Sequence, residues 1–163
     1  MSPSSRATSA VADPVARPHQ YLVVRVGAER FALPLHSVEE ALDAPEPFRP
    51  PGLDERCLGL LEWRGRRVPL CCPEAVLGCA AAGTPGAALV LDDADQPLAV
   101  AVDDALDVVT LPAERVLKLR GLRDPYGVVS GMARLDDGLV ALVHTDALRA
   151  ALREQAAAPR GGA

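Results

Sequence analysis

Short runs of aliphatic and β-branched residues, separated by glycine, proline and aspartate, recur along the chain from residue 21 to residue 143. About ten such runs can be counted, and no interval between them holds a helix of useful length. A doubly wound α/β sheet needs a helix between successive strands and is therefore excluded. The pattern predicts an all-β fold, either a barrel or a sandwich.

Most of the predicted strands pair as hairpins. Asp137-Gly138 is the clearest turn signal and predicts a type I′ hairpin. One helical turn fits after the second strand, and a helix follows His144, capped by Thr145 or Asp146. The predicted strands are residues 21–26, 30–33, 40–42, the two arms of 58–70, 87–91, 98–102, 106–111, 132–135 and 139–143, and the helix is 147–152.

Composition limits the core and the partners. Apolar residues make up 49% of the 163 residues but aromatic residues only 3%, so valine, leucine and alanine must fill the core of a single domain. The net charge of −5 argues against a nucleic-acid binder, because phosphate binding is driven by a basic surface. Proline and small polar residues predict a disordered tail over residues 1–19.

Neither a targeting segment nor a membrane span is visible. The first nineteen residues contain no continuous apolar segment, and no later run approaches the length that crosses a bilayer. We therefore expect a cytoplasmic protein with reduced cysteines. The spacing of Cys57, Cys71, Cys72 and Cys79 lacks the paired C-x-x-C motif of a zinc site, so plain packing of small residues is expected.

The sequence contains few residue patterns that are typical of catalytic sites. His19, His36 and His144 do not have the spacing of metal ligands, and no glycine-rich phosphate motif occurs. The acidic residues at 92–95 and 103–104 fit turns and strand ends better than a calcium loop. A nucleophile built from Cys72 and His144 is the one enzymatic alternative left open, because such partners meet only in the fold. We expect no cofactor and no metal.

The hairpin at residues 58–70 carries an unusual turn. Its tip is Gly65, and Trp63, Arg64 and Arg66 gather beside it, where a surface turn ordinarily carries Asn, Asp or Ser. One interpretation is a solvated basic turn that keeps a sheet edge soluble. The other is a recognition tip, since tryptophan and arginine often anchor protein interfaces. Pro69 in the second arm is tolerable only at an edge or where its nitrogen faces no partner.

Four segments in order resemble the CheW-like domain over about residues 21–152. They are Val38-Glu39-Glu40, the hairpin 58–70 with its G-x-x-x-x-R-G-x-x-x-P core, residues 102–109, and residues 129–132. The resemblance implies two interlocked five-stranded SH3-like β-barrels with a short C-terminal helix, spanning residues 20–153 and followed by a flexible tail at 154–163. It also implies no catalysis. CheW-like proteins couple the cytoplasmic tips of methyl-accepting chemoreceptors to the histidine kinase CheA, in arrays at the membrane.

The resemblance also implies site residues. Arg64 matches the family's arginine before glycine, and Glu40 matches a glutamate that pairs with it, so we predict a Glu40–Arg64 ion pair that orients a docking surface. The alternative is that Arg64 contacts the partner directly and Glu40 merely lies nearby. The predicted partner-binding residues are Val38, Glu40, Glu62, Trp63, Arg64, Gly65 and Arg66.

Two departures from the family pattern fall on this surface. Glu62-Trp63 stands where Asn and an aliphatic residue are usual, and Leu70-Cys71-Cys72-Pro73 lacks the usual aspartate. Trp63 is either an exposed anchor at a new interface or a residue tucked between the barrels. The departures also leave open a scaffold or antagonist that serves another array, such as one controlling surface motility.

Overall fold

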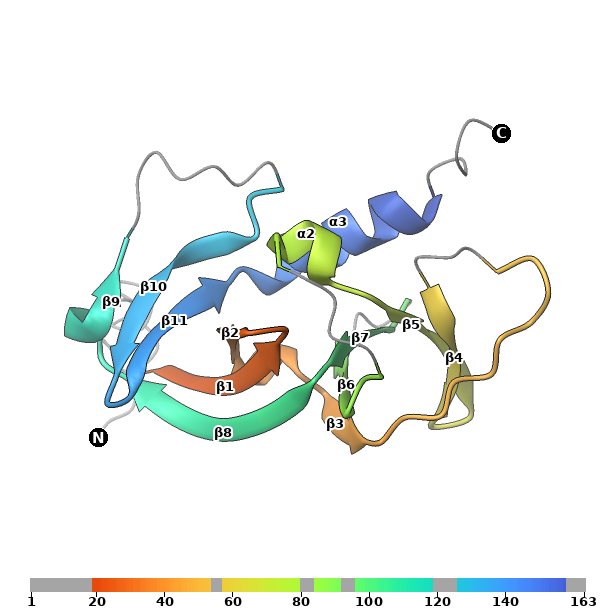
Figure 1. Ribbon diagram of the computed structural model, residues 1–163, viewed down its shortest axis with the longest axis horizontal. Helices are drawn as coiled ribbons and strands as arrows, with labels where there is room; N and C mark the ends of the chain where they lie inside the picture. The colour runs from red at the N-terminus through yellow and green to blue at the C-terminus, as the bar shows by residue number, and fades with distance from the viewer. Residues whose placement is uncertain (1–18, 54–56, 80–83, 92–95, 119–125, 158–163) are drawn as a thin grey trace, which may run out of the picture.

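Strands dominate the computed structural model, which describes residues 19–53, 57–79, 84–91, 96–118 and 126–157. Within these ranges eleven strands form two sheets (Figure 1), which confirms the all-β prediction. The strands are β1 (His19–Val26), β2 (Glu29–Pro34), β3 (Glu40–Asp43), β4 (Cys57–Trp63), β5 (Arg66–Cys71), β6 (Ala87–Leu91), β7 (Leu98–Val102), β8 (Asp104–Leu111), β9 (Val116–Leu117), β10 (Val129–Leu135) and β11 (Gly138–Val143).

The two sheets are interleaved along the chain. One sheet has the order β8-β1-β2-β11-β10-β9 and takes its strands from both ends of the chain, whereas the other, β3-β6-β7-β5-β4, is built from the middle. In Figure 1 the long strand β8 follows β7 of the second sheet and runs alongside β1, so it belongs to the first sheet. The fold is that of two SH3-like barrels, with six strands in the first sheet where five were predicted, because the two-residue strand β9 pairs with β10.

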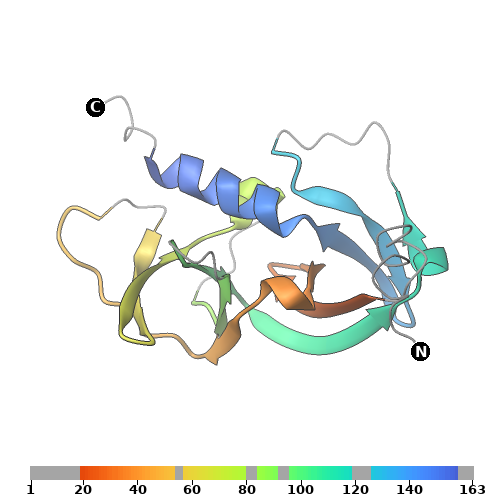
Figure 2. The ribbon, with the colours of Figure 1, turned by 180° about the vertical axis from the view of Figure 1, so that it is seen from behind.

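Three clusters of buried side chains form the core. The largest joins the two sheets, since it combines residues of β1, β2 and β11 with residues of β5, β6 and β7. Leu148 and Leu152 of the helix α3 (Thr145–Ala157) pack into this cluster, and Figure 2 shows α3 running across both sheets. A second cluster lies within the second sheet and a third within the first. All residues of β6 and β7 are buried.

The ends of the elements differ from the predicted ones by a few residues. His19 already pairs with Leu111 in the β1–β8 ladder, so the predicted tail ends too late by at least one residue. Helix α3 continues to Ala157, past the predicted start of a flexible tail at residue 154. Residues 1–18 and 158–163, on which the rest of both tail predictions falls, lie outside the described residues.

Three short helices lie between strands of the described chain. The predicted helical turn is the 3-10 helix Leu35–Ser37, while α2 (Glu74–Leu77) and the 3-10 helix Ala113–Arg115 were not predicted individually. No helix among the described residues is long and apolar enough to span a membrane.

The turn between β10 and β11 is not the predicted one. Leu135 pairs with Gly138, so the two loop residues are Asp136 and Asp137 and not Asp137-Gly138. A type I′ turn needs a positive φ at both loop residues, and neither aspartate has one. Gly138, with φ of 138°, instead opens β11, and Asp137 forms an ion pair with Arg30 at 2.9 Å. The ion pair ties this turn to β2.

Pro69 lies inside the second sheet, because β5 has β4 on one side and β7 on the other. Its partner in the β4–β5 ladder is Leu60, whose backbone nitrogen and oxygen both bond to Phe48. The parallel ladder with β7 begins only at Leu70. Pro69 therefore occupies a position where no ladder hydrogen bond requires an N–H. The proline is tolerated because its nitrogen faces no partner, and not because β5 is an edge strand.

Gly59 allows the 45–51 loop to lie against β4. Its φ is 151°, and a Cβ there would lie 2.6 Å from the Pro47 Cβ and 2.8 Å from the Phe48 oxygen. We expect Gly59→Ala to lower the free energy of unfolding by about 1–3 kcal/mol, because backbone must move to admit the methyl group. The measurement is the urea midpoint. Gly52→Ala is the matched control, since Gly52 also has a positive φ but no atom within 4 Å of the added Cβ; equal losses in the two variants would refute a steric cause.

Candidate protein-docking site

The tip of the β4–β5 hairpin is a two-residue turn. Trp63 pairs with Arg66, which leaves Arg64 and Gly65 as the loop, with φ of 49° and 75°. Two successive left-handed residues define the type I′ turn, which matches the twist of the flanking strands. The conformation suits Gly65 but costs a non-glycine residue such as Arg64 roughly 1–2 kcal/mol. Such strain in a non-glycine residue is a feature of functional positions.

The Trp63 side chain is buried directly below this turn. It is only 6% exposed and packs in the core of the second sheet with Leu61, Val68 and Leu70. The indole Nε1 donates a hydrogen bond of 2.9 Å to the Oε1 of Glu40. The apolar part of the ring is thus buried, and its N–H is satisfied at the rim of the barrel.

Arg64 lies over this ring and faces two carboxylates. Its guanidinium carbon is 4.5 Å from the centroid of the Trp63 ring, a cation–π distance. The predicted ion pair with Glu40 is present at 3.9 Å, and a closer one, of 3.4 Å, joins Arg64 to Glu39. The Arg64 side chain remains 60% exposed. Exposed ion pairs contribute about 0–1 kcal/mol, so these contacts orient the arginine more than they stabilise the fold.

Glu39 is the member of this cluster that sequence reasoning missed. Adjacent residues of a strand point to opposite faces, so only one of Glu39 and Glu40 is expected to reach the tip. This alternation does not apply to Glu39, because Glu39 precedes β3. Its backbone N–H donates a hydrogen bond of 2.7 Å to the Val90 oxygen. Both carboxylates therefore reach Arg64.

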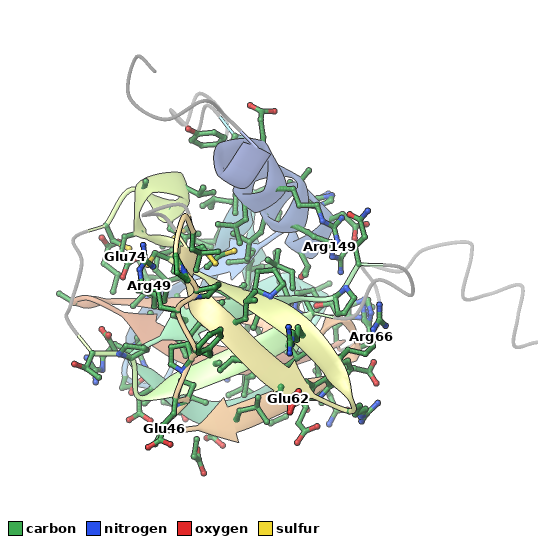
Figure 3. All side chains as sticks on the ribbon, turned by 90° about the vertical axis from the view of Figure 1, so that its right-hand side faces the viewer. Glu46, Arg49, Glu62, Arg66, Glu74 and Arg149 are labelled. Carbon is green, nitrogen blue, oxygen red and sulfur yellow. The ribbon has the colours of Figure 1, made fainter. Side chains whose placement is uncertain are left out.

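The remaining predicted site residues are Val38, Glu62 and Arg66. Val38 is half-buried and packs against the core that joins the sheets. Glu62 is exposed and stands opposite Arg67 in the β4–β5 ladder. Figure 3 shows Glu62 and Arg66 on the hairpin, seen from the side of the second sheet. The structure thus brings together Glu40, Trp63 and Arg64, and places Gly65 in the turn that presents them.

Neither sequence expectation for Trp63 describes its environment. The indole is not an exposed anchor, because only 6% of the surface of Trp63 is exposed. It also does not lie between the barrels, since its neighbours belong to the cluster within the second sheet. The physical reason is the pleat: Leu61 and Trp63 alternate with the exposed Glu62, and the inward face of β4 is the core of its own barrel.

The enzymatic alternative based on Cys72 lacks an activated thiol. Burial raises the pKa of Cys72 to about 11, so the side chain stays protonated near neutral pH. Among the described residues, no group of three or more His, Cys, Asp or Glu side chains is placed to hold a metal ion. The exposed arginine at the tip has the chemistry of a protein contact.

Comparisons with known proteins identify the family and support the fold. The model of the CheW-like domain matches residues 20–152. Among solved structures, the chain is similar to the scaffolding protein TtCheW from Thermoanaerobacter tengcongensis, with a TM-score of 0.67 and 18% sequence identity over 77% of this chain and 88% of that one. No match was found among curated proteins. Because the family model spans most of the sequence, the chain belongs to the CheW-like domain family.

Proposed function

We propose that the protein is a non-catalytic adaptor that couples chemoreceptors to a CheA-type histidine kinase. The observation that carries the proposal is membership of the CheW-like family over residues 20–152. The arrangement of Arg64 supports it, because an exposed guanidinium is held over a buried ring by two carboxylates. A side chain positioned before binding loses less conformational entropy when a partner docks.

The docking contact is Arg64 itself. Its distances to the two carboxylates, 3.4 Å and 3.9 Å, are longer than those of a close charge-assisted hydrogen bond. A carboxylate of the partner can therefore bind the guanidinium while Glu39 and Glu40 keep it in place. Gly65 leaves the space beside the arginine open, since no atom lies within 4 Å of the position of its missing Cβ.

The partners we propose are the cytoplasmic tip of a methyl-accepting chemoreceptor and the kinase. The protein would work in the cytoplasm and reach the membrane only through these partners, without inserting into it. Its net charge of −5 argues against nucleic acid as a further partner.

A second candidate function is a CheW-like scaffold or antagonist that occupies array positions, including those of a surface-motility system, without activating a kinase. The observation that favours it is the exposed Glu62 opposite Arg67, which places a carboxylate on the outer face beside the tip where the family usually has an asparagine. A changed charge on the rim of an interface alters partner choice more than fold stability.

Reconstitution distinguishes these two functions. The purified protein is titrated into the histidine kinase of its own cell, with and without membranes that carry the receptor, and kinase autophosphorylation is measured. An adaptor raises the kinase activity several-fold, and only when receptor is present, because it joins the two proteins. An antagonist instead lowers the activity of a mixture that already contains a working adaptor. Binding to neither receptor nor kinase would refute both functions.

A further inference from the structure

Two cysteines face each other at the base of the β4–β5 hairpin. Cys57 opens β4 and Cys71 closes β5, and the two are direct partners in the antiparallel ladder. Directly opposite residues in such a ladder have Cα atoms roughly 4.5–5.5 Å apart and side chains on the same face. A disulfide bond needs Cα atoms about 4.4–6.8 Å apart. Ladder partners of this kind have the spacing that a cross-strand disulfide needs, and both cysteines are free. The register of β4 shifts between Cys57 and Gly59, so a β-bulge lies next to the pair.

The two thiols interact unequally. A hydrogen bond between the Cys71 and Cys57 sulfur atoms lowers the pKa of Cys57 although burial opposes the shift. The Cys57 Sγ also donates to the Gly59 carbonyl oxygen at 3.3 Å. The positive charge of Arg49, whose Nη1 also donates to the Cys57 oxygen at 2.6 Å, lowers the pKa of Cys57 further. The hydrogen bond between the two sulfur atoms and burial raise the pKa of Cys71. Cys57 thus has the character of an attacking thiolate, and Cys71 that of a second thiol that keeps its proton.

A cavity gives small molecules access to this pair. Cys57 and Cys71 line a space of about 570 Å³ between the hairpin, the start of β7 and the end of α3. Its other walls include the apolar Leu152 and the basic Arg66, Arg67 and Arg153. Each cysteine is only 4% exposed, so a small oxidant reaches the sulfur atoms more readily than a bulky thiol does. The charges that act on the pair are those of Arg49 on Cys57 and of Arg153 on Cys71, and Figure 3 shows Arg49 beside the hairpin.

We propose that Cys57 and Cys71 are a peroxide-responsive thiol pair, a modification site that closes to a disulfide across the base of the hairpin. The Cys57 thiolate attacks one oxygen of hydrogen peroxide, which forms a sulfenic acid and releases hydroxide. The Cys71 sulfur then attacks the sulfenic sulfur, and its proton leaves with the sulfenic oxygen as water. In sum, two thiols and one hydrogen peroxide give one disulfide and two waters, and the two sulfur atoms supply the two electrons. A dithiol reductant reverses the reaction.

The other two cysteines serve as internal controls. Burial raises the pKa of both Cys72 and Cys79 to about 11, so neither forms much thiolate at neutral pH. Cys72 also follows Cys71 directly and lies outside β5, so it lacks the register that pairs Cys71 with Cys57. The proposal does not depend on the proposed adaptor function, because it concerns only these side chains and their cavity.

The test uses the full chain, freshly reduced and folded, treated with hydrogen peroxide at neutral pH. Remaining thiols are then alkylated, and peptides are mapped by mass spectrometry without reduction. We expect one intramolecular link, between Cys57 and Cys71, with Cys72 and Cys79 recovered as alkylated thiols. We also expect the thermal midpoint to rise on oxidation and to return after treatment with a dithiol.

Variants separate the two roles. In Cys71→Ser the disulfide is lost, and a sulfenic acid at Cys57 is trapped by a dimedone-type reagent; Cys57→Ser gives neither product. Cys79→Ser is the matched control and keeps the wild-type yield of the Cys57–Cys71 link. A link from Cys57 to Cys72, oxidation of all four cysteines at one rate, or thiols that react only after denaturation would each overturn the proposal. Each of these three contradicting outcomes can be observed with the wild-type protein alone. A variant that fails to fold therefore does not prevent the test.

Discussion

Arg64→Glu is expected to abolish kinase coupling while leaving the thermal midpoint nearly unchanged. The side chain is 60% exposed and its ion pairs are with exposed carboxylates, so their loss costs about 0–1 kcal/mol of stability. At an interface the same change removes a cation and adds a third carboxylate beside Glu39 and Glu40. Arginine anchors of interfaces contribute about 2 kcal/mol or more, which corresponds to roughly a 30-fold loss of affinity.

The measurements for this variant are receptor-dependent kinase activity and a thermal melt of the same preparation. Arg134→Glu is the matched control, because Arg134 is an exposed residue of β10 in the other sheet and undergoes the same change of charge. Coupling lost in the first variant and retained in the second supports docking at the tip. If the melt of Arg64→Glu collapses together with its activity, the residue is structural and the proposed contact is wrong.

A charge swap distinguishes orientation from direct contact. Combining Arg64→Glu with Glu39→Lys restores an ion pair of opposite polarity at the tip while leaving Glu40 bonded to Trp63. If the ion pair only orients the turn, the double variant regains coupling. If Arg64 binds a carboxylate of the partner, as we propose, the double variant stays inactive, because the partner then meets a glutamate.

Local signals in the sequence were enough for most strands but not for their arrangement. The two apolar runs within residues 58–70 and the glycine at 65 predicted the hairpin and its tip, because strand and turn signals depend on neighbouring residues alone. The pairing of β1 and β2 with strands from the far end of the chain depends on packing between distant segments. Local periodicity does not specify such pairing, and the family resemblance predicted two interlocked barrels without saying which strands pair.

The two larger surprises both arise at the ends of strands. Glu39 reaches Arg64 because it lies just before β3, which begins at Glu40 as predicted, so the alternation of a strand does not govern its side chain. Cys57 faces Cys71 because β4 begins and β5 ends one residue outside the predicted arms, so neither cysteine was assigned a ladder partner. Boundaries depend on tertiary hydrogen bonds such as that of Glu39 to Val90.

Trp63→Ala is expected to destabilise the protein strongly. The indole is 6% exposed and packs with Leu61, Val68 and Leu70, so its removal opens a cavity in the second barrel. Deleting a buried tryptophan side chain costs about 3–5 kcal/mol. The measurement is urea unfolding followed by circular dichroism, because Trp63 is the chain's single tryptophan and the variant loses that fluorescence signal.

Trp63→Phe separates packing from hydrogen bonding at the same position. It keeps an aromatic ring in the core but loses the Nε1 donor to Glu40, a bond whose net contribution is about 1 kcal/mol. A folded Trp63→Phe protein that still couples receptor to kinase would assign Trp63 to the support of Arg64 and not to partner choice. A loss below 1 kcal/mol in Trp63→Ala would contradict the buried indole. Because Arg64 lies over this ring, intermediate loss of coupling in Trp63→Phe with a loss of stability of only about 1 kcal/mol would instead show that the bond from Trp63 to Glu40 helps to position the arginine.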